Sequence, residues 1–94
     1  MTETLEKERQ EMIKHCQIMY DYEVKSCMDE IHNCAIKNPT ARKVRIRRRR
    51  TSDAFKIALS QACAKEDMVA TFGWFGTIEI WLYQDEYYAE WWAV

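Results

Sequence analysis

Hydrophobic residues recur every three or four positions along the first third of the chain, which is the spacing of one face of an α-helix. Residues 4–37 contain neither glycine nor proline. Pro39 ends the segment, because the residue before a proline avoids the helical conformation. The pattern therefore predicts one long N-terminal helix over residues 1–38. Its apolar stripe consists of Ile13, Cys16, Tyr20, Val24, Cys27, Ile31 and Cys34.

A continuous helix of this length would extend for about 50 Å, which is further than a small domain can cover. Either the helix breaks, near residues 20–23, or its overhang packs against another copy of the chain. We expect the second outcome, because the apolar stripe approximates a heptad seam over about three heptads. The chain is therefore predicted to form a homodimer through this helix.

Residues 42–50 follow a different period, because apolar and basic side chains alternate along them. Val44 and Ile46 are the apolar positions. A period of two predicts a β-strand with one apolar face and one basic face. Residues 51–53 are all of types that favour the N-cap position, so a second helix is predicted to begin there and to lie against the sheet.

Residues 68–83 are rich in β-branched and aromatic side chains and again show a period of two. Gly73 and Gly76 bracket Trp74 and Phe75, which predicts a hairpin loop at this point. The alternative is one long strand with a bulge at glycine.

The predicted fold class is α+β, with a long N-terminal helix followed by β-α-β-β and a small antiparallel or mixed sheet. Ninety-four residues are expected to form a single domain over residues 1–94. Residues 39–94 make up the small α+β unit, and its last eleven residues, 84–94, form an acidic aromatic tail.

Charge is segregated along the chain, although the net charge is only −1. Residues 1–38 contain eight acidic and five basic side chains, and residues 39–65 contain nine basic and one acidic. Residues 66–94 contain six acidic side chains and no basic one. Blocks of one sign usually meet a partner of the opposite sign, inside the chain or outside it.

The basic block is concentrated in the run KVRIRRRR at residues 43–50. In a strand, alternate members of this run would share one face with Trp81 and Tyr83 of the neighbouring strand. Guanidinium groups on phosphates and rings under bases are the contacts by which sheets bind single-stranded nucleic acid. We therefore predict a nucleic-acid or polyanion site made of Arg42, Lys43, Arg45, Arg47, Arg48, Arg49, Arg50, Trp81 and Tyr83.

Three alternatives stay open for the same run. Charged residues on an edge strand deter pairing with other strands. The arginines could instead pair inside the chain, with Glu79, Asp85, Glu86 and Glu90, or contact an acidic protein surface. Arg48 and Arg50 are expected on the opposite face of the strand, near Asp53, which could neutralise one of them.

Aromatic residues form a second candidate surface, for a protein partner. Exposed tryptophan is a typical interface anchor, and four aromatics in the tail are too much apolar surface to stay unpacked. The predicted partner-binding residues are Trp74, Phe75, Tyr87, Tyr88, Trp91 and Trp92. The alternatives are that Trp74 or Phe75 packs into the core, and that the tail docks on its own domain or on a twin subunit.

Catalytic and metal-binding patterns are missing from the sequence. There is no glycine-rich phosphate loop, and no pair of cysteines or histidines has metal-ligand spacing. We therefore predict no enzymatic activity, no metal and no cofactor. The acidic N-terminus and the lack of an apolar run of membrane length predict a cytoplasmic protein that does not enter a membrane and keeps its four cysteines reduced.

The functional prediction is a small non-enzymatic binding protein that uses an arginine-rich strand to contact a polyanion, above all nucleic acid. The alternative is a protein–protein inhibitor or regulator, of the kind that viruses and mobile elements encode. Such a protein would bind a nucleic-acid-processing enzyme through exposed aromatics and the charged run. A third class, an assembly subunit, follows if the basic and acidic blocks meet between copies.

Overall fold

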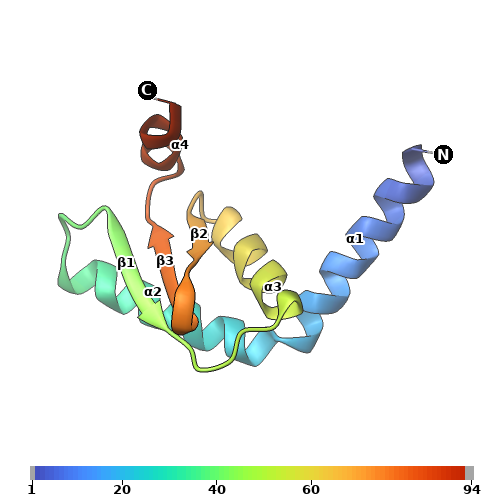
Figure 1. Cartoon of the computed structure of the whole chain (residues 1–94), viewed down its shortest axis with the longest axis horizontal. Coiled ribbons are helices and arrows are strands. Elements are labelled where there is room, and N and C mark those ends of the chain that lie inside the picture. The colour runs from blue at the N-terminus through green and yellow to red at the C-terminus, as the bar shows by residue number, and fades with distance from the viewer. Residues whose placement is uncertain (1, 93–94) are drawn as a thin grey trace.

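The computed structural model describes the backbone of residues 2–92 and the side chains of residues 3–90. Along the chain, helices precede and follow a strand–helix–strand–strand unit. The elements are α1 (Thr2–Met19), α2 (Asp21–Lys37), β1 (Lys43–Arg47), α3 (Asp53–Ala64), β2 (Val69–Phe72), the 3₁₀ turn η1 (Trp74–Gly76), β3 (Thr77–Trp81) and α4 (Gln84–Trp92), as Figure 1 shows. The predicted α+β class and the predicted β-α-β-β order are therefore confirmed.

The central strand of the sheet is β3, with β1 and β2 on either side of it and antiparallel to it. Helix α3 connects β1 to β2, and a hairpin connects β2 to β3. The register places Lys43 opposite Trp81 and Arg45 opposite Glu79. Residues directly opposite each other project from the same face of a sheet, so these four side chains share one face.

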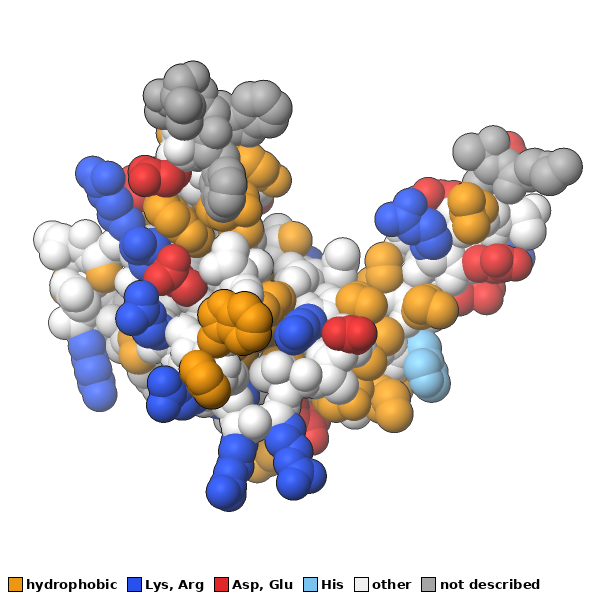
Figure 2. All heavy atoms as spheres, viewed as in Figure 1, with side chains coloured by type: hydrophobic (Ala, Val, Ile, Leu, Met, Phe, Trp, Pro, Cys, Tyr) orange, Lys and Arg blue, Asp and Glu red, His pale blue; other side chains and the backbone are white. Residues whose placement is uncertain are grey.

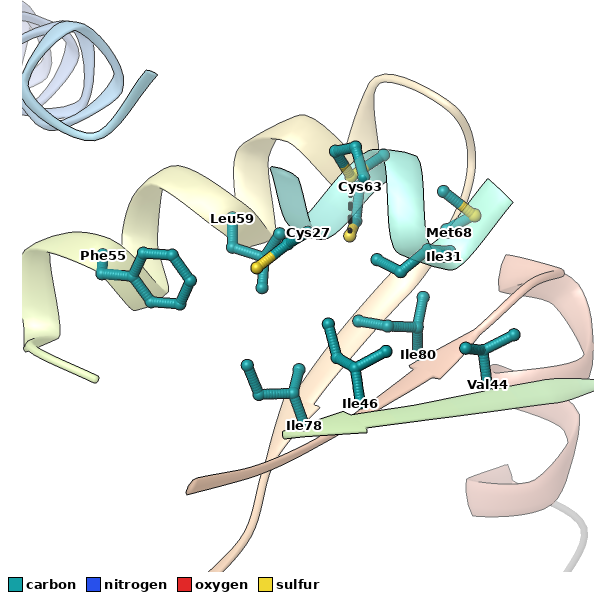
Figure 3. Packing of buried hydrophobic residues seen from close by; sticks show 11 residues of the cluster. Cys27, Ile31, Val44, Ile46, Phe55, Leu59, Cys63, Met68, Ile78 and Ile80 are labelled. Atoms are coloured by element: carbon teal, nitrogen blue, oxygen red, sulfur yellow. Dashed lines mark hydrogen bonds between the residues drawn. The ribbon is translucent and has the colours of Figure 1, made fainter. Parts of the chain in front are cut away.

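The hydrophobic core lies on the other face of the sheet, which α2 and α3 cover (Figure 1). Figure 3 shows the isoleucines of the strands pointing toward these helices. The fully buried side chains of the core include Cys27 and Ile31 from α2, Leu59 and Cys63 from α3, and Ile78 and Ile80 from β3. Burial of this apolar surface is the main driving force for the fold.

The N-terminal helix is divided at Tyr20, so the expectation of one continuous helix over residues 1–38 is wrong, and the alternative of a break near residues 20–23 is confirmed. The Tyr20 ring contacts Phe55 edge-on, with 6.0 Å between centroids, and its hydroxyl accepts a hydrogen bond from Ser52 at 3.0 Å. The break turns the chain so that α1 packs on α3 while α2 packs on the sheet. A straight helix would carry part of the apolar stripe away from the domain.

Helix α1 extends beyond the body of the protein (Figure 1), and Leu5 and Met12 on it are exposed. The overhang that motivated the dimer is thus present, although it is shorter than the continuous helix would have given. Dimerisation through this helix stays a prediction.

The start of α3 and the hairpin follow the sequence signals closely. Ser52 is the N-cap of α3, and its side chain accepts a hydrogen bond from the Phe55 amide at 3.1 Å. Gly73 donates its amide proton to the Thr77 carbonyl at 2.9 Å, which closes the turn around η1. The alternative of one long bulged strand is therefore wrong.

The acidic aromatic tail forms helix α4 up to Trp92, which the sequence reasoning missed. The segment contains no glycine or proline, and Asp85 and Glu86 lie in its first turn, where the positive end of the helix dipole favours acidic residues. The amides of Glu86 and Tyr87 donate to the Tyr83 carbonyl at the start of the helix.

Gly76 is needed where the hairpin meets β1. Its φ angle is +75°, and a Cβ atom at this position would lie 1.9 Å from the Arg48 carbonyl oxygen. The Arg48 amide donates to the Gly76 carbonyl at 2.8 Å on the same edge. Backbone approaches backbone here, so no side chain can be accommodated without a shift.

We expect Gly76→Ala to lower the free energy of unfolding by about 2–4 kcal/mol, because the clash adds to the cost of a positive φ angle. Gly73→Ala is the matched control, since its φ angle is −110° and the nearest atom would be 3.8 Å from the new Cβ. Urea unfolding of both variants measures the difference. Equal effects of the two changes would show that the Gly76–Arg48 approach does not constrain the fold.

Candidate functional site

The outward face of β1 is basic, as the period of two predicts. Lys43, Arg45 and Arg47 are exposed, whereas Val44 and Ile46 between them are buried. Arg42 precedes the strand, and residues 48–50 follow it in the connection to α3. The seven basic residues of the prediction therefore belong to one edge of the sheet, but only three of them lie within the strand.

Glu79 occupies the middle of this face and takes two of the positive charges. Its carboxylate lies 3.2 Å from Nη2 of Arg45 and 3.8 Å from Nζ of Lys43. Internal pairing, which the sequence left as an alternative, therefore occurs here. Exposed pairs of this kind contribute about 0–1 kcal/mol, and one carboxylate cannot neutralise two cations, so a positive charge remains.

The end of the face near α4 is closed by aromatic contacts. The Trp81 ring lies 4.9 Å below Nζ of Lys43 and meets the Tyr87 ring edge-on at 5.7 Å between centroids. Arg42 pairs with Glu86 of α4 at 3.7 Å. Trp81 does lie on the outer face, as predicted, but its ring is half-covered by these neighbours and is not an open platform for a base.

The remaining predicted aromatics are placed less favourably for that role. Tyr83 follows β3 instead of lying within it, and it is exposed. Tyr88 is exposed on α4 and stacks its edge against Tyr87. The side chains of Trp91 and Trp92 lie outside the described residues. The tail thus docks on its own domain through Tyr87.

Arg48 has a structural role, and its partner is not the predicted Asp53. Its Nη2 lies 2.8 Å from Glu30 of α2, and its Nη1 donates to the Arg47 carbonyl at 2.9 Å. Burial alone would lower the pKa of Arg48, but Glu30 and the nearby Cys27 raise it overall, so the side chain stays charged. Arg48 therefore braces the end of β1 against α2.

Arg47, Arg49 and Arg50 form no ion pair with any carboxylate in residues 3–90. Arg49 and Arg50 are exposed in the connection before α3, and Asp53, the nearest acid along the chain, begins that helix. We call these three residues the free arginines. They are the part of the basic run that the structure leaves available.

The aromatic tip of the hairpin adjoins this same end of the sheet. Trp74 is 85% exposed and Phe75 is 90% exposed, so neither packs into the core. The hydrogen bond from Arg48 to Gly76 holds the tip against the segment that carries the free arginines. Figure 2 shows Lys and Arg side chains along the left and lower edges of the molecule, where β1 and the connection after it lie, with exposed hydrophobic side chains on the face beside them.

Sequence reasoning identified these arginines and these rings but assigned them to two separate surfaces. The register of β1 on β3 brings Arg47 opposite Thr77, which directly follows η1. The sequence pattern does not predict that β1 and the hairpin turn lie close together, because the two segments are almost thirty residues apart in the chain. The flanking glycines left two alternatives for Trp74 and Phe75, exposed rings or rings packed into the core, and the structure shows exposed rings.

The groove between α1 and α3 and the cysteines are weaker candidates for a functional site than the basic run and the hairpin tip. A groove between α1 and α3 is lined by Arg9, Met12, Ile13, Lys56 and Ile57, among others, and is mainly apolar. All four cysteines are free, and Cys16, Cys27 and Cys63 are buried. Within the described part of the chain, no group of three or more histidine, cysteine or acidic side chains is arranged to hold a metal ion.

None of the helices in residues 2–92 is both long and apolar enough to cross a lipid bilayer. Comparison of the chain with protein-family models, with curated proteins and with solved structures finds no match.

Breaking the Arg48–Glu30 pair should destabilise the fold. We expect Arg48→Ala to lower the free energy of unfolding by about 1–2 kcal/mol, because it leaves Glu30 without its partner. Arg49→Ala, the matched control, should change it by less than about 0.5 kcal/mol. A double-mutant cycle with Glu30→Ala isolates the pair, and a coupling energy near zero would contradict the bracing role.

Burial raises the pKa of the Cys63 thiol to about 12, above its ordinary value of 9.0. The folded state therefore favours the protonated thiol. Stability from this group is complete below pH 9.0 and is lost as the pH rises toward 12, with a slope of at most about 1.4 kcal/mol per pH unit.

The measurement is the free energy of unfolding under reducing conditions as the pH is raised above 9.0, for the natural chain and for Cys63→Ala. Tyrosine and lysine titrations are common to both proteins, so the difference between the two curves reports Cys63. Parallel curves would contradict the raised pKa.

Proposed function

We propose that this protein is a non-enzymatic binding protein that contacts nucleic acid through the free arginines, Arg47, Arg49 and Arg50. The observation that carries the proposal is that these three guanidinium groups stay exposed and unpaired with any described carboxylate, in a chain with fifteen acidic side chains. A chain that needed arginine only for internal pairing would leave fewer of them free.

The chemistry of the side chain supports a phosphate partner. Guanidinium is planar, stays charged and can donate two parallel hydrogen bonds to one phosphate group. Each phosphate neutralised in this way releases condensed counterions, which supplies most of the affinity of sequence-independent binding. Three such groups within four residues give a high local positive charge.

The net charge of −1 does not prevent such binding, because fourteen of the fifteen acidic residues lie outside residues 39–65, and Asp53 is the exception. Glu30, Glu79 and Glu86 are already paired with Arg48, Arg45 and Arg42. The acidic first half of α1 extends away from the sheet (Figure 1). At physiological salt the Debye length is about 8 Å, so distant acids contribute little at the free arginines.

The test is a titration of fluorescent oligonucleotides of about 20 nucleotides, repeated from about 50 mM to about 200 mM salt. The natural chain should bind with an affinity that falls steeply with salt. Replacing Arg47, Arg49 and Arg50 together with glutamine should lower the affinity at least ~10-fold and reduce the salt slope by about two to three units.

The matched control replaces Lys7, Arg9 and Lys14 of α1 with glutamine, which removes the same charge from a distant site. This variant should bind nearly as well as the natural chain. If both triple variants lose affinity equally, general charge and not the free arginines is responsible. If the natural chain does not bind at all, the proposal fails.

A second candidate function is binding to a nucleic-acid-processing protein, in the manner of an inhibitor. The exposure of Trp74 and Phe75 favours it, because such rings are frequent anchors of protein interfaces. A pull-down from cell lysate with and without nuclease separates the two functions. The second function would be favoured by a partner that the natural chain retains after nuclease treatment and that a variant with Trp74 and Phe75 replaced by leucine does not retain.

A further inference from the structure

The hairpin tip, Trp74 and Phe75, is the most exposed aromatic surface in the described part of the chain, and neither ring takes part in an intramolecular ring contact there. We propose that the tip stacks on unpaired bases and makes the adjoining free arginines selective for single-stranded nucleic acid. This inference rests on the function proposed above and adds the form of the ligand.

The geometry of the tip favours a ligand that is bound from outside. Phe75 has a φ angle of +57°, a conformation that L-residues other than asparagine and aspartate rarely adopt. Both adjacent rings at this turn are exposed, so neither folds back onto the core. Strain of this kind is often retained where a functional site requires it.

The tip and the arginines are held in a fixed relation. The Arg48 amide bonds to Gly76 at 2.8 Å, and the Arg48 side chain is held by Glu30 at 2.8 Å. The backbone between Arg47 and Arg49 is therefore held against Gly76, the residue that ends the turn carrying the two rings. A ligand that touches the rings and the arginines together must present anionic and flat apolar groups side by side.

Nucleic acid has this combination, because each nucleotide carries one phosphate and one base. In a duplex the faces of the bases are already stacked, and exposing one requires unstacking and unpairing. In a single strand the faces are available, and stacking on aromatic rings tolerates any base sequence. Trp81 cannot substitute for the tip, since Lys43 and Tyr87 already contact its ring.

The experiment compares three ligands: a mixed-sequence single-stranded oligonucleotide, the duplex of the same length, and inorganic polyphosphate, which has charge but no bases. The natural chain should bind the single strand at least ~10-fold more tightly than the duplex. Replacing Trp74 and Phe75 together with leucine keeps apolar side chains but removes the rings. This change should weaken single-strand binding by about 10-fold to 100-fold.

The same variant should bind polyphosphate as tightly as the natural chain, with an unchanged salt slope, since the arginines are intact. Tyr22→Leu is the matched control, because Tyr22 is 82% exposed on α2 and contributes no charge. It should leave all three affinities unchanged. Circular dichroism and the unfolding midpoint check that the tip variant is folded. We expect it to fold normally, because both replaced rings are exposed.

The possible results separate this inference from the function on which it rests. Equal affinity of the natural chain for single strand and duplex, or a tip variant that binds the single strand normally, overturns base stacking but leaves nucleic-acid binding in place. If the tip variant loses affinity equally for the oligonucleotide and for polyphosphate, base stacking is overturned as well. The rings would then only position the arginines and would not contact bases. Failure to bind any of the three ligands overturns both.

Discussion

One residue, Arg48, connects helix α2, the edge strand β1 and the hairpin between β2 and β3. Its side chain pairs with Glu30 of α2, its amide bonds to Gly76, and its carbonyl lies where a Cβ of Gly76 would be. Helix, edge strand and hairpin are thereby fixed to each other at one corner of the sheet. The contact permits only glycine on the hairpin side and includes an ion pair on the helix side, so it joins positions far apart in the chain.

The basic run around Arg48 divides into three parts with different environments. Lys43 and Arg45 pair with Glu79, and Arg42 pairs with Glu86. Arg48 pairs with Glu30 of α2. Arg47, Arg49 and Arg50 form no ion pair with a carboxylate of residues 3–90. The division explains how a chain of net charge −1 can present a local cationic surface. It also places that surface beside the exposed hairpin tip and away from the aromatic cluster of Trp81 and Tyr87.

Elements with strong local signals were predictable. Alternation around Val44 and Ile46 indicated β1, Ser52 marked the start of α3, and the glycines at 73 and 76 marked the hairpin. Helix α4 was not predicted, and the break at Tyr20 was left as the less favoured of two alternatives. The break depends on the contacts of Tyr20 with Phe55 and Ser52, which are distant in sequence. Helix α4 has only a weak apolar periodicity, so its sequence is equally compatible with an irregular tail.

The sequence by itself determined which residues are basic, which aromatics are flanked by glycine, and which faces of the elements are apolar. These properties follow from side-chain type and from the periods of helix and strand, which are local. Only the tertiary structure decided which arginines are paired and which remain free, and that the segment carrying the free ones approaches the hairpin at Gly76. Ion pairs and strand register join residues far apart in the chain, so their partners are set by how the elements pack and not by spacing along the sequence.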